Sequence, residues 1–146
     1  MKFVFCAVLT GFLVGCSAEP SVEQQIIASL EQMELSAEEG RHLDFMSGVA
    51  KDFSGQYEGM DRREFHRFMI FQMNENRRLH AQLFPIHVKE TAAGQASAQF
   101  NILVTGGGGL LPERGQLFEV ETAWVRDGGD WLLSKADWEP VDFSSR

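Results

Sequence analysis

The spacing of apolar residues changes from helical to alternating about halfway along the chain. In the first half they recur at every third or fourth position, which gathers them on one face of a helix. From Leu83 onward they occupy every second position, as in strands that bury one face of a sheet. This order predicts an α+β fold in which three N-terminal helices cover one side of an antiparallel sheet.

The helical half divides into three segments. The first has an apolar face made of Val22, Ile26, Leu30 and Met33. It should end at Gly40, because glycine tolerates the left-handed turn that closes many helices. A shorter helix should follow, with apolar positions from Leu43 to Phe53, and then a turn-rich segment, residues 54–59, with room for one short strand. Asp61 and Glu64 have the spacing of a capping box and predict the start of a third helix.

The third helix combines a basic face with an apolar face that contains two amides. The apolar residues are Phe65, Phe68, Met69 and Leu79, and the basic face carries Arg62, Arg63, His66, Arg67, Arg77 and Arg78. Gln72 and Asn76 lie in the middle of the apolar arc. A buried amide without partners costs roughly 1–3 kcal/mol, so each must be satisfied or face a wet cavity. The two amides either bond to strand backbone and hold the helix on the sheet, or line a pocket and orient a ligand.

Four strands are predicted in the second half. They comprise Leu83 to Thr91, Ala98 to Thr105, Phe118 to Trp124 and Trp131 to Glu139. Phe84, Ile86 and Val88 should share one face of the first of them. Pro85 lacks an N–H for the sheet, which predicts an edge strand or a bulge there. The long glycine-rich segment 106–115 reads as a loop, and Asp127-Gly128-Gly129-Asp130 reads as a hairpin turn.

The first twenty residues differ from the rest of the chain. Lys2 gives a positive start, residues 3–14 are almost wholly apolar, and Ser17-Ala18-Glu19-Pro20 is polar. Spanning a bilayer takes about 20 apolar residues, and this run is shorter. A positive start, a short apolar core and small residues near its end are typical of a secretory signal.

Leu13-Val14-Gly15-Cys16 resembles the lipobox of bacterial lipoproteins. The resemblance implies a signal peptide over residues 1–15, lipid attachment at Cys16, a lipidated tether over residues 16–21, and one folded domain over residues 22–146. Two or more acyl chains give a firm membrane anchor. Ser17 stands where an aspartate would be the usual inner-membrane retention signal, so the resemblance favours the outer membrane, facing the periplasm.

The order of elements from Val22 to Val141 resembles the nuclear transport factor 2-like superfamily. The resemblance also rests on Asp52-Phe53 closing the second helix and on the hairpin from Trp124 to Trp131. It implies a curved sheet that wraps a long helix into a cone, with a pocket inside and an open sheet face that often pairs with a second copy. A set of predicted bacterial lipoproteins of this superfamily, without an assigned role, is similar.

Charge and motifs exclude several functions. The 146 residues carry 21 acidic and 13 basic side chains, which argues against nucleic-acid binding by a tethered chain. The histidines at positions 42, 66, 80 and 87 lack metal-ligand spacing, and no cysteine pair supports them, so we expect no metal. Gly106-Gly107-Gly108-Gly109 is not followed by the lysine of a phosphate loop. We expect no cofactor.

Few residues suggest catalysis. Glu119 and Glu121 should face solvent, and a single acid without a positioned partner is weak support for acid–base chemistry. Asp137 alternates with Trp138, so one of them points inward. Trp124 and Asp137 join Gln72 and Asn76 as candidate pocket-lining residues.

We therefore expect a cell-envelope lipoprotein with a non-catalytic domain that binds a small molecule or another protein. The alternative is a periplasmic enzyme of the isomerase, dehydratase or hydrolase type, acting on a small apolar substrate in the cone. Such an assignment would rest on fold analogy rather than on a site. A structural homodimer that pairs through the open sheet face is a third expectation.

Overall fold

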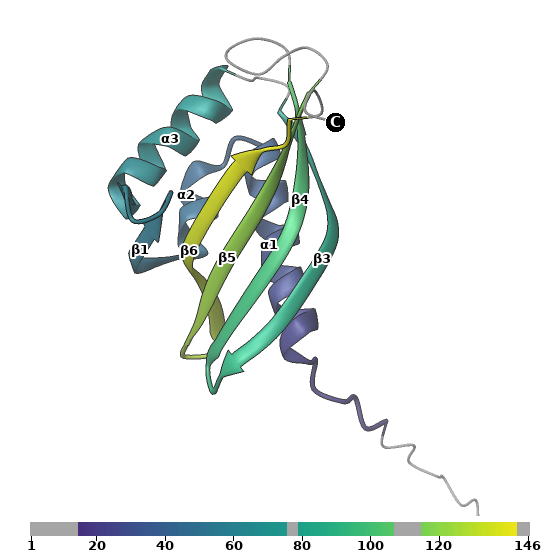
Figure 1. The fold of residues 1–146 in the computed structure, drawn as a ribbon. Coiled ribbons are helices and arrows are strands. Elements are labelled where there is room, and N and C mark those ends of the chain that lie inside the picture. Colours follow the sequence, from purple (N-terminus) through teal and green to yellow (C-terminus); the bar gives the residue numbers. More distant parts are fainter. Residues whose placement is uncertain (1–14, 76–78, 107–114, 143–146) are drawn as a thin grey trace, which may run out of the picture.

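The computed structural model describes residues 15–75, 79–106 and 115–142, and these form a helical layer on a curved sheet (Figure 1). The helices are α1 (Val22–Glu38), α2 (His42–Ser47) and α3 (Arg62–Glu75). The strands are β1 (Val49–Gly55), β2 (Met60–Asp61), β3 (His80–Ala92), β4 (Gln95–Thr105), β5 (Gln116–Asp127) and β6 (Asp130–Pro140). The predicted α+β fold is confirmed, but β1 and β2 separate the second helix from the third, so the three helices are not consecutive.

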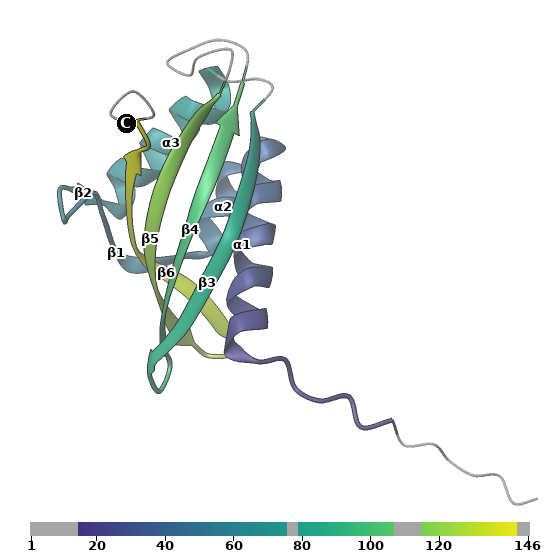
Figure 2. The same cartoon turned by 45° about the vertical axis from the view of Figure 1, so that its right-hand side comes forward.

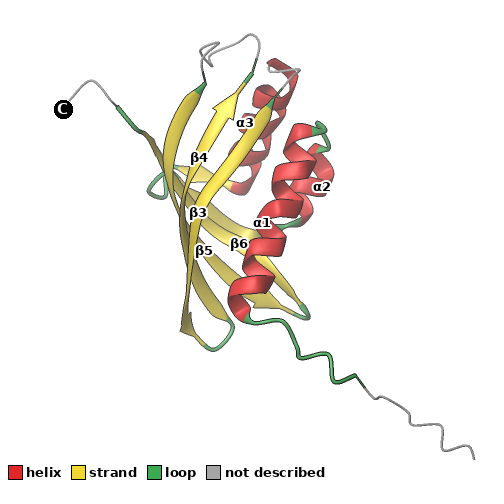
Figure 3. Ribbon diagram, turned by 90° about the vertical axis from the view of Figure 1, so that its right-hand side faces the viewer, coloured by secondary structure: helices red, strands yellow, loops and turns green. Residues whose placement is uncertain are grey.

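The six strands form one sheet in the order β2-β1-β6-β5-β4-β3. The sheet is antiparallel except where β1 runs parallel to β6, which corrects the expectation of a wholly antiparallel sheet. Figure 2 shows β1 and β2 at one edge and β3 at the other edge, beside α1. All three helices lie on the same side of the curved sheet (Figure 3). Among the helices in the described residues, none has the length and apolarity needed to cross a lipid bilayer.

The first helix follows its predicted pattern. Its N-terminus is a capping box, in which Gln24 N donates to Ser21 Oγ at 3.2 Å and Ser21 N donates to Gln24 Oε1 at 2.9 Å. Its predicted apolar face is buried at Ile26, Leu30 and Met33. The helix ends at Glu38, and Gly40 has a φ of 69°, as the closing turn requires.

The second helix is shorter than predicted. It ends at Ser47, and the segment that contains Asp52 and Phe53 is strand β1 rather than the end of a helix. The prediction was wrong because buried residues in this segment, such as Val49 and Phe53, also suit a strand. Strand β6 supplies the hydrogen-bonding edge, beginning with Leu133 N, which donates to Gly48 O at 2.8 Å.

The third helix begins as predicted. Glu64 N donates to Asp61 Oδ1 and Asp61 N donates to Glu64 Oε2, both at 2.8 Å, which completes a capping box. Arg62 also donates from its guanidinium to Met46 O at 3.0 Å and so links α3 to the end of α2. These contacts fix the helix that carries Gln72.

A bulge lies at Pro85, as its missing N–H predicts, and β3 is also an edge strand. The register of β3 against β4 shifts between Phe84 and His87. Residues before the shift therefore point to the opposite face of the sheet from the one that simple alternation predicts. Phe84 is therefore 41% exposed on the outer face, and it does not share the inner face with Ile86 and Val88 as predicted.

The two ends of the cone differ in how they are filled. At one end, near the β5–β6 hairpin, Trp124 is 1% exposed and Trp131 is buried. Trp131 Nε1 donates to Gln25 Oε1 at 3.0 Å, which places this filled end beside the start of α1. At the other end, Glu38 near the end of α1 accepts from Ala81 N at 2.9 Å, at the start of β3. Among the described residues, every buried core residue follows Ser21, so the core that the structure describes lies within the chain from Ser21 onward.

A candidate ligand cavity

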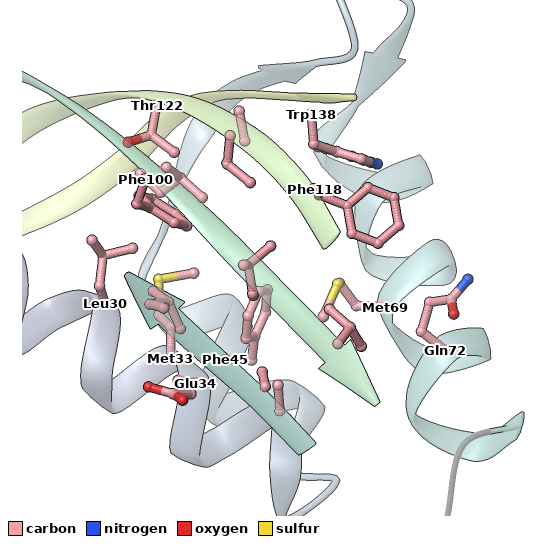
Figure 4. A pocket seen from close by; sticks show the side chains of 18 of the residues that line it. Leu30, Met33, Glu34, Phe45, Met69, Gln72, Phe100, Phe118, Thr122 and Trp138 are labelled. Carbon is pink, nitrogen blue, oxygen red and sulfur yellow. The ribbon is translucent and has the colours of Figure 1, made fainter. Parts of the chain in front are cut away.

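A cavity of about 520 Å³ lies between the helices and the sheet, away from the filled end of the cone. Its wall comes from α1, α2 and α3 on one side. On the other side it comes from the first half of β3 and β5, the second half of β4, and β6 from Leu133 to Pro140. The aromatic part of the wall is Phe45, Phe65, Phe68, Phe100, Phe118 and Trp138. Figure 4 shows Phe45, Phe100, Phe118 and Trp138 around the cavity.

Aromatic stacking orders the wall on the α3 side. The rings of Phe68 and Trp138 stack with centroids 5.5 Å apart, and Phe65 stacks on Phe53 at 4.5 Å. The side chain of Gln56 fixes the indole of Trp138. With its amide oxygen oriented toward the ring, Gln56 accepts a hydrogen bond from Trp138 Nε1 at 3.0 Å. The ring therefore presents its apolar surface to the cavity.

Four polar residues lie among the described residues that line the cavity, and two of them form hydrogen bonds with the backbone. The Thr122 hydroxyl donates to Ala98 O at 2.8 Å and accepts from Trp124 Nε1 at 2.9 Å. Gln116 Nε2 donates to Leu117 O at 2.9 Å. The other two polar residues are Glu34 on α1 and Gln72 on α3, which lie on different sides of the cavity in Figure 4.

Glu34 is the titratable residue among the described lining residues. Burial raises the pKa of its carboxyl group above the usual value, Glu38 and Glu31 raise it further, and His80 acts in the opposite direction. Glu38 itself contacts His80 Nδ1 at 2.7 Å. Within the described part of the chain, no hydrogen bond or ion pair engages the Glu34 carboxylate.

The predicted pocket residues lie in different places. Gln72 lines the cavity, and Asn76 falls outside the described residues. Trp124 points inward but fills the base of the cone instead of lining the cavity, because the small side chains of Ala96 and Ala98 leave room for its ring there. Whether any of them binds a ligand stays a prediction.

Asp137 faces the outer surface of the sheet, and its neighbour Trp138 is the one that points into the cavity. Asp137 Oδ1 accepts from Tyr57 N at 2.7 Å, and Lys135 Nζ lies 3.5 Å from Asp137 Oδ2. The Tyr57 hydroxyl donates to Glu139 at 2.6 Å, and this bond raises the pKa of Tyr57 to about 12. These groups fix the β1–β2 turn on the outside of the cone and do not add chemistry to the cavity.

Two further predictions concern acids and metals. Glu119 and Glu121 are exposed on the outer face, as the alternation predicted. Over residues 15–75, 79–106 and 115–142, no three histidine, cysteine or acidic side chains gather closely enough to hold a metal ion. The titratable group that sequence reasoning missed is Glu34. Its position in the sequence could have indicated this. Glu34 follows Val22, Ile26 and Leu30 at a regular spacing of four, which places it on the same apolar face of the helix.

Comparison with known proteins finds likeness in structure but not in sequence. No protein-family model matches the chain, and no curated protein matches it significantly. A candidate scytalone dehydratase from Novosphingobium aromaticivorans has a TM-score of 0.69 at 8% identity, over 81% of this chain and 83% of that one. A candidate dehydratase of the NTF2-like family from Streptomyces avermitilis has a TM-score of 0.69 at 18% identity, over 80% and 94%. An NTF2-like protein of unknown function from Pseudomonas putida has a TM-score of 0.67 at 16% identity, over 84% and 89%.

Identities this low carry the fold and not the activity, since one fold hosts many unrelated functions. The similar structures agree with the cone described above in their overall architecture and in the extent of chain that they cover. The chain has the nuclear transport factor 2-like fold.

Proposed function

We propose that this protein is a cell-envelope lipoprotein, anchored at Cys16, whose cone binds a small apolar molecule without transforming it. The observation that carries the binding role is the cavity of about 520 Å³ with an almost wholly apolar wall. Small-molecule sites in proteins span roughly 300–1,000 Å³ and are mostly apolar with a few polar groups, and this cavity has both properties.

The chemistry of the wall favours binding over catalysis. Acid–base catalysis needs a group positioned by a partner against the reacting atom. Glu34 is the acid in the described wall, and no described residue holds its carboxylate by a hydrogen bond. The hydroxyl of Thr122 is engaged with the backbone and with Trp124.

A periplasmic enzyme of the isomerase, dehydratase or hydrolase type is the second candidate. One observation favours it: burial keeps the pKa of Glu34 above its usual value inside a cavity, which is a property of acid–base residues in enzymes. Turnover of a bound apolar molecule by the wild type, and its loss in Glu34→Gln, would favour this candidate over simple binding.

Filling the cavity tests the binding role. Ile102 lines the cavity, and its neighbour Leu103 faces the other side of β4. Ile102→Trp should reduce the affinity for N-phenyl-1-naphthylamine, an uncharged apolar fluorophore, by at least about tenfold, or 1.4 kcal/mol, because the indole takes up the ligand's space. Leu103→Trp adds the same ring outside the cavity and should bind like the wild type.

The measurement is a fluorescence titration of the chain from Ser21 to Arg146, with circular dichroism to confirm the fold of each variant. Equal affinity of the two tryptophan variants would show that the probe binds elsewhere and would remove the cavity from the proposal. Native mass spectrometry of the protein purified from its own envelope then identifies a retained molecule.

A further inference from the structure

Glu34 is the charged residue in the described wall of the cavity. The other described lining residues are apolar side chains and the uncharged Gln72, Gln116 and Thr122. Figure 4 shows Glu34 beside Met33 on α1, with Gln72 on α3 and apolar side chains between them. A molecule in the cavity therefore meets one negative side chain at one side and an apolar wall over most of its surface.

The surroundings of Glu34 do not neutralise it. Glu31 and Glu38 are the nearby acids on α1, and His80 on β3 is the nearby base. The Glu38 carboxylate accepts from Ala81 N at 2.9 Å and contacts His80 Nδ1 at 2.7 Å, so the ring of His80 is directed to Glu38. No residue in the described part of the chain donates a hydrogen bond to the Glu34 carboxylate, so a donor on a bound molecule could supply one.

A partly buried carboxylate without a hydrogen-bond donor is destabilising, because it loses part of its hydration without replacement. A ligand that carries a donor would remove this penalty, and a cationic ligand would add Coulomb attraction. A ligand with its own carboxylate would meet the repulsion between two like charges. Glu34 should thus discriminate between ligands of similar apolar bulk by their polar end.

We propose that the cavity selects amphiphilic molecules whose polar end is a hydrogen-bond donor, such as a hydroxyl or an ammonium group, and that Glu34 binds that end. The inference rests on the proposed binding function and names the ligand class. The apolar part of the ligand lies against Phe100, Phe118 and Trp138, and fatty acid anions bind more weakly than amines or alcohols of the same chain length.

Three ligands with the same chain and different polar ends test the proposal. Dodecylamine, dodecanol and dodecanoate compete with N-phenyl-1-naphthylamine for the chain from Ser21 to Arg146, at neutral pH and below micelle-forming concentrations. For the wild type we expect the amine and the alcohol to displace the probe at concentrations at least about tenfold below that of dodecanoate, a difference of 1.4 kcal/mol. Comparing the affinities of the amine and the alcohol separates the contribution of charge from that of hydrogen bonding, because both donate hydrogen bonds and only the amine is charged.

Variants assign the selection to Glu34. Glu34→Gln should bring the amine and the carboxylate to within about threefold of each other, whereas Glu34→Asp keeps the charge and should keep the preference. Glu31→Gln removes the same charge from an exposed position on the same helix and should retain the wild-type order. Thermal unfolding of each variant checks that the fold is intact.

The outcomes separate the two proposals. Displacement by dodecanoate as readily as by dodecylamine in the wild type, or an unchanged preference in Glu34→Gln, overturns the role of Glu34 and leaves the binding function standing. Failure of the wild type to bind the probe at all overturns the binding function and the ligand class together.

Discussion

Glu34 lies in the folded chain where its negative charge is disfavoured. Burial, Glu38 and Glu31 raise the pKa of its carboxyl group above the usual value of 4.5. The folded chain therefore binds the Glu34 proton more tightly than the unfolded chain does. It follows by linkage that this group lowers stability as the pH rises through the region just above 4.5, and that the loss persists at neutral pH.

Replacing this carboxyl group with an amide should stabilise the protein. Glu34→Gln resembles the protonated form, so we expect a higher midpoint of thermal unfolding than the wild type at pH 7 and little difference at pH 4. Differential scanning calorimetry at both pH values measures this. A lower midpoint for Glu34→Gln at pH 7 would mean that the charge is stabilised by contacts in the fold, contrary to the shift of its pKa.

Sequence patterns predicted some residues of the site and missed others. Helical spacing put Gln72 on the inner face of α3, where the structure has it. Strand alternation showed that either Asp137 or Trp138 points inward, but β6 has a register shift opposite Ala123 and Trp124, so counting along the strand could not decide which. Glu34 was missed because a charged residue at the border of an apolar face usually reaches solvent.

At the scale of elements, the start of α3 depends on local contacts that the sequence shows. Asp61 and Glu64 form the expected capping box, and the helix that they begin supplies Phe65, Phe68 and Gln72 to the cavity. Loosening this end of the helix should therefore affect both stability and the cavity wall.

Removing the cap provides the test. Asp61→Ala should lower the free energy of unfolding by about 1 kcal/mol, because the N–H of Glu64 loses its acceptor. Asp52→Ala removes the same charge from an exposed position on β1 and should change stability by less than about 0.5 kcal/mol. Urea denaturation followed by circular dichroism compares the two, and equal losses would show that charge, not capping, accounts for the effect.

Other elements depend on distant parts of the chain and could not be predicted locally. The residues from Val49 to Phe53 suit a helix by their spacing, and they form β1 because β6 offers them an edge to pair with. The face to which Phe84 points depends on a bulge. Pro85 indicated that a bulge could occur there, but the sequence did not show how it would shift the pairing of β3 with β4. Tertiary pairing decided both cases.

At the scale of the whole molecule, the alternating pattern predicted which strand residues point inward but not how completely they fill the cone. Trp124 and Trp131 occupy the base, while Phe100 and Phe118 line a space and do not close it. Whether the interior of the cone is filled depends on the total volume of the inward-pointing side chains relative to the space that the curved sheet encloses. Neither quantity can be read from a periodic pattern.

Membrane attachment is the prediction that concerns the whole molecule. In bacterial cells, the wild type should incorporate radioactive palmitate and sediment with the outer membrane, because the lipobox-like sequence Leu13-Val14-Gly15-Cys16 predicts a lipid on Cys16. Cys16→Ala should incorporate none. Cys6→Ala removes the other cysteine and should be labelled like the wild type, and an unlabelled wild type would rule out the anchor.

The position of the tether relative to the cavity has a consequence for ligand exchange. The tether joins α1 at the base filled by Trp131, and the cavity lies toward the opposite end of the cone. A helix of 17 residues is about 25 Å long. A lipid on Cys16 would thus attach the molecule to the bilayer at the end of the cone that is opposite the cavity. Cargo would then arrive through the water of the periplasm, or from a carrier protein, and not by sideways diffusion out of the membrane that holds the anchor.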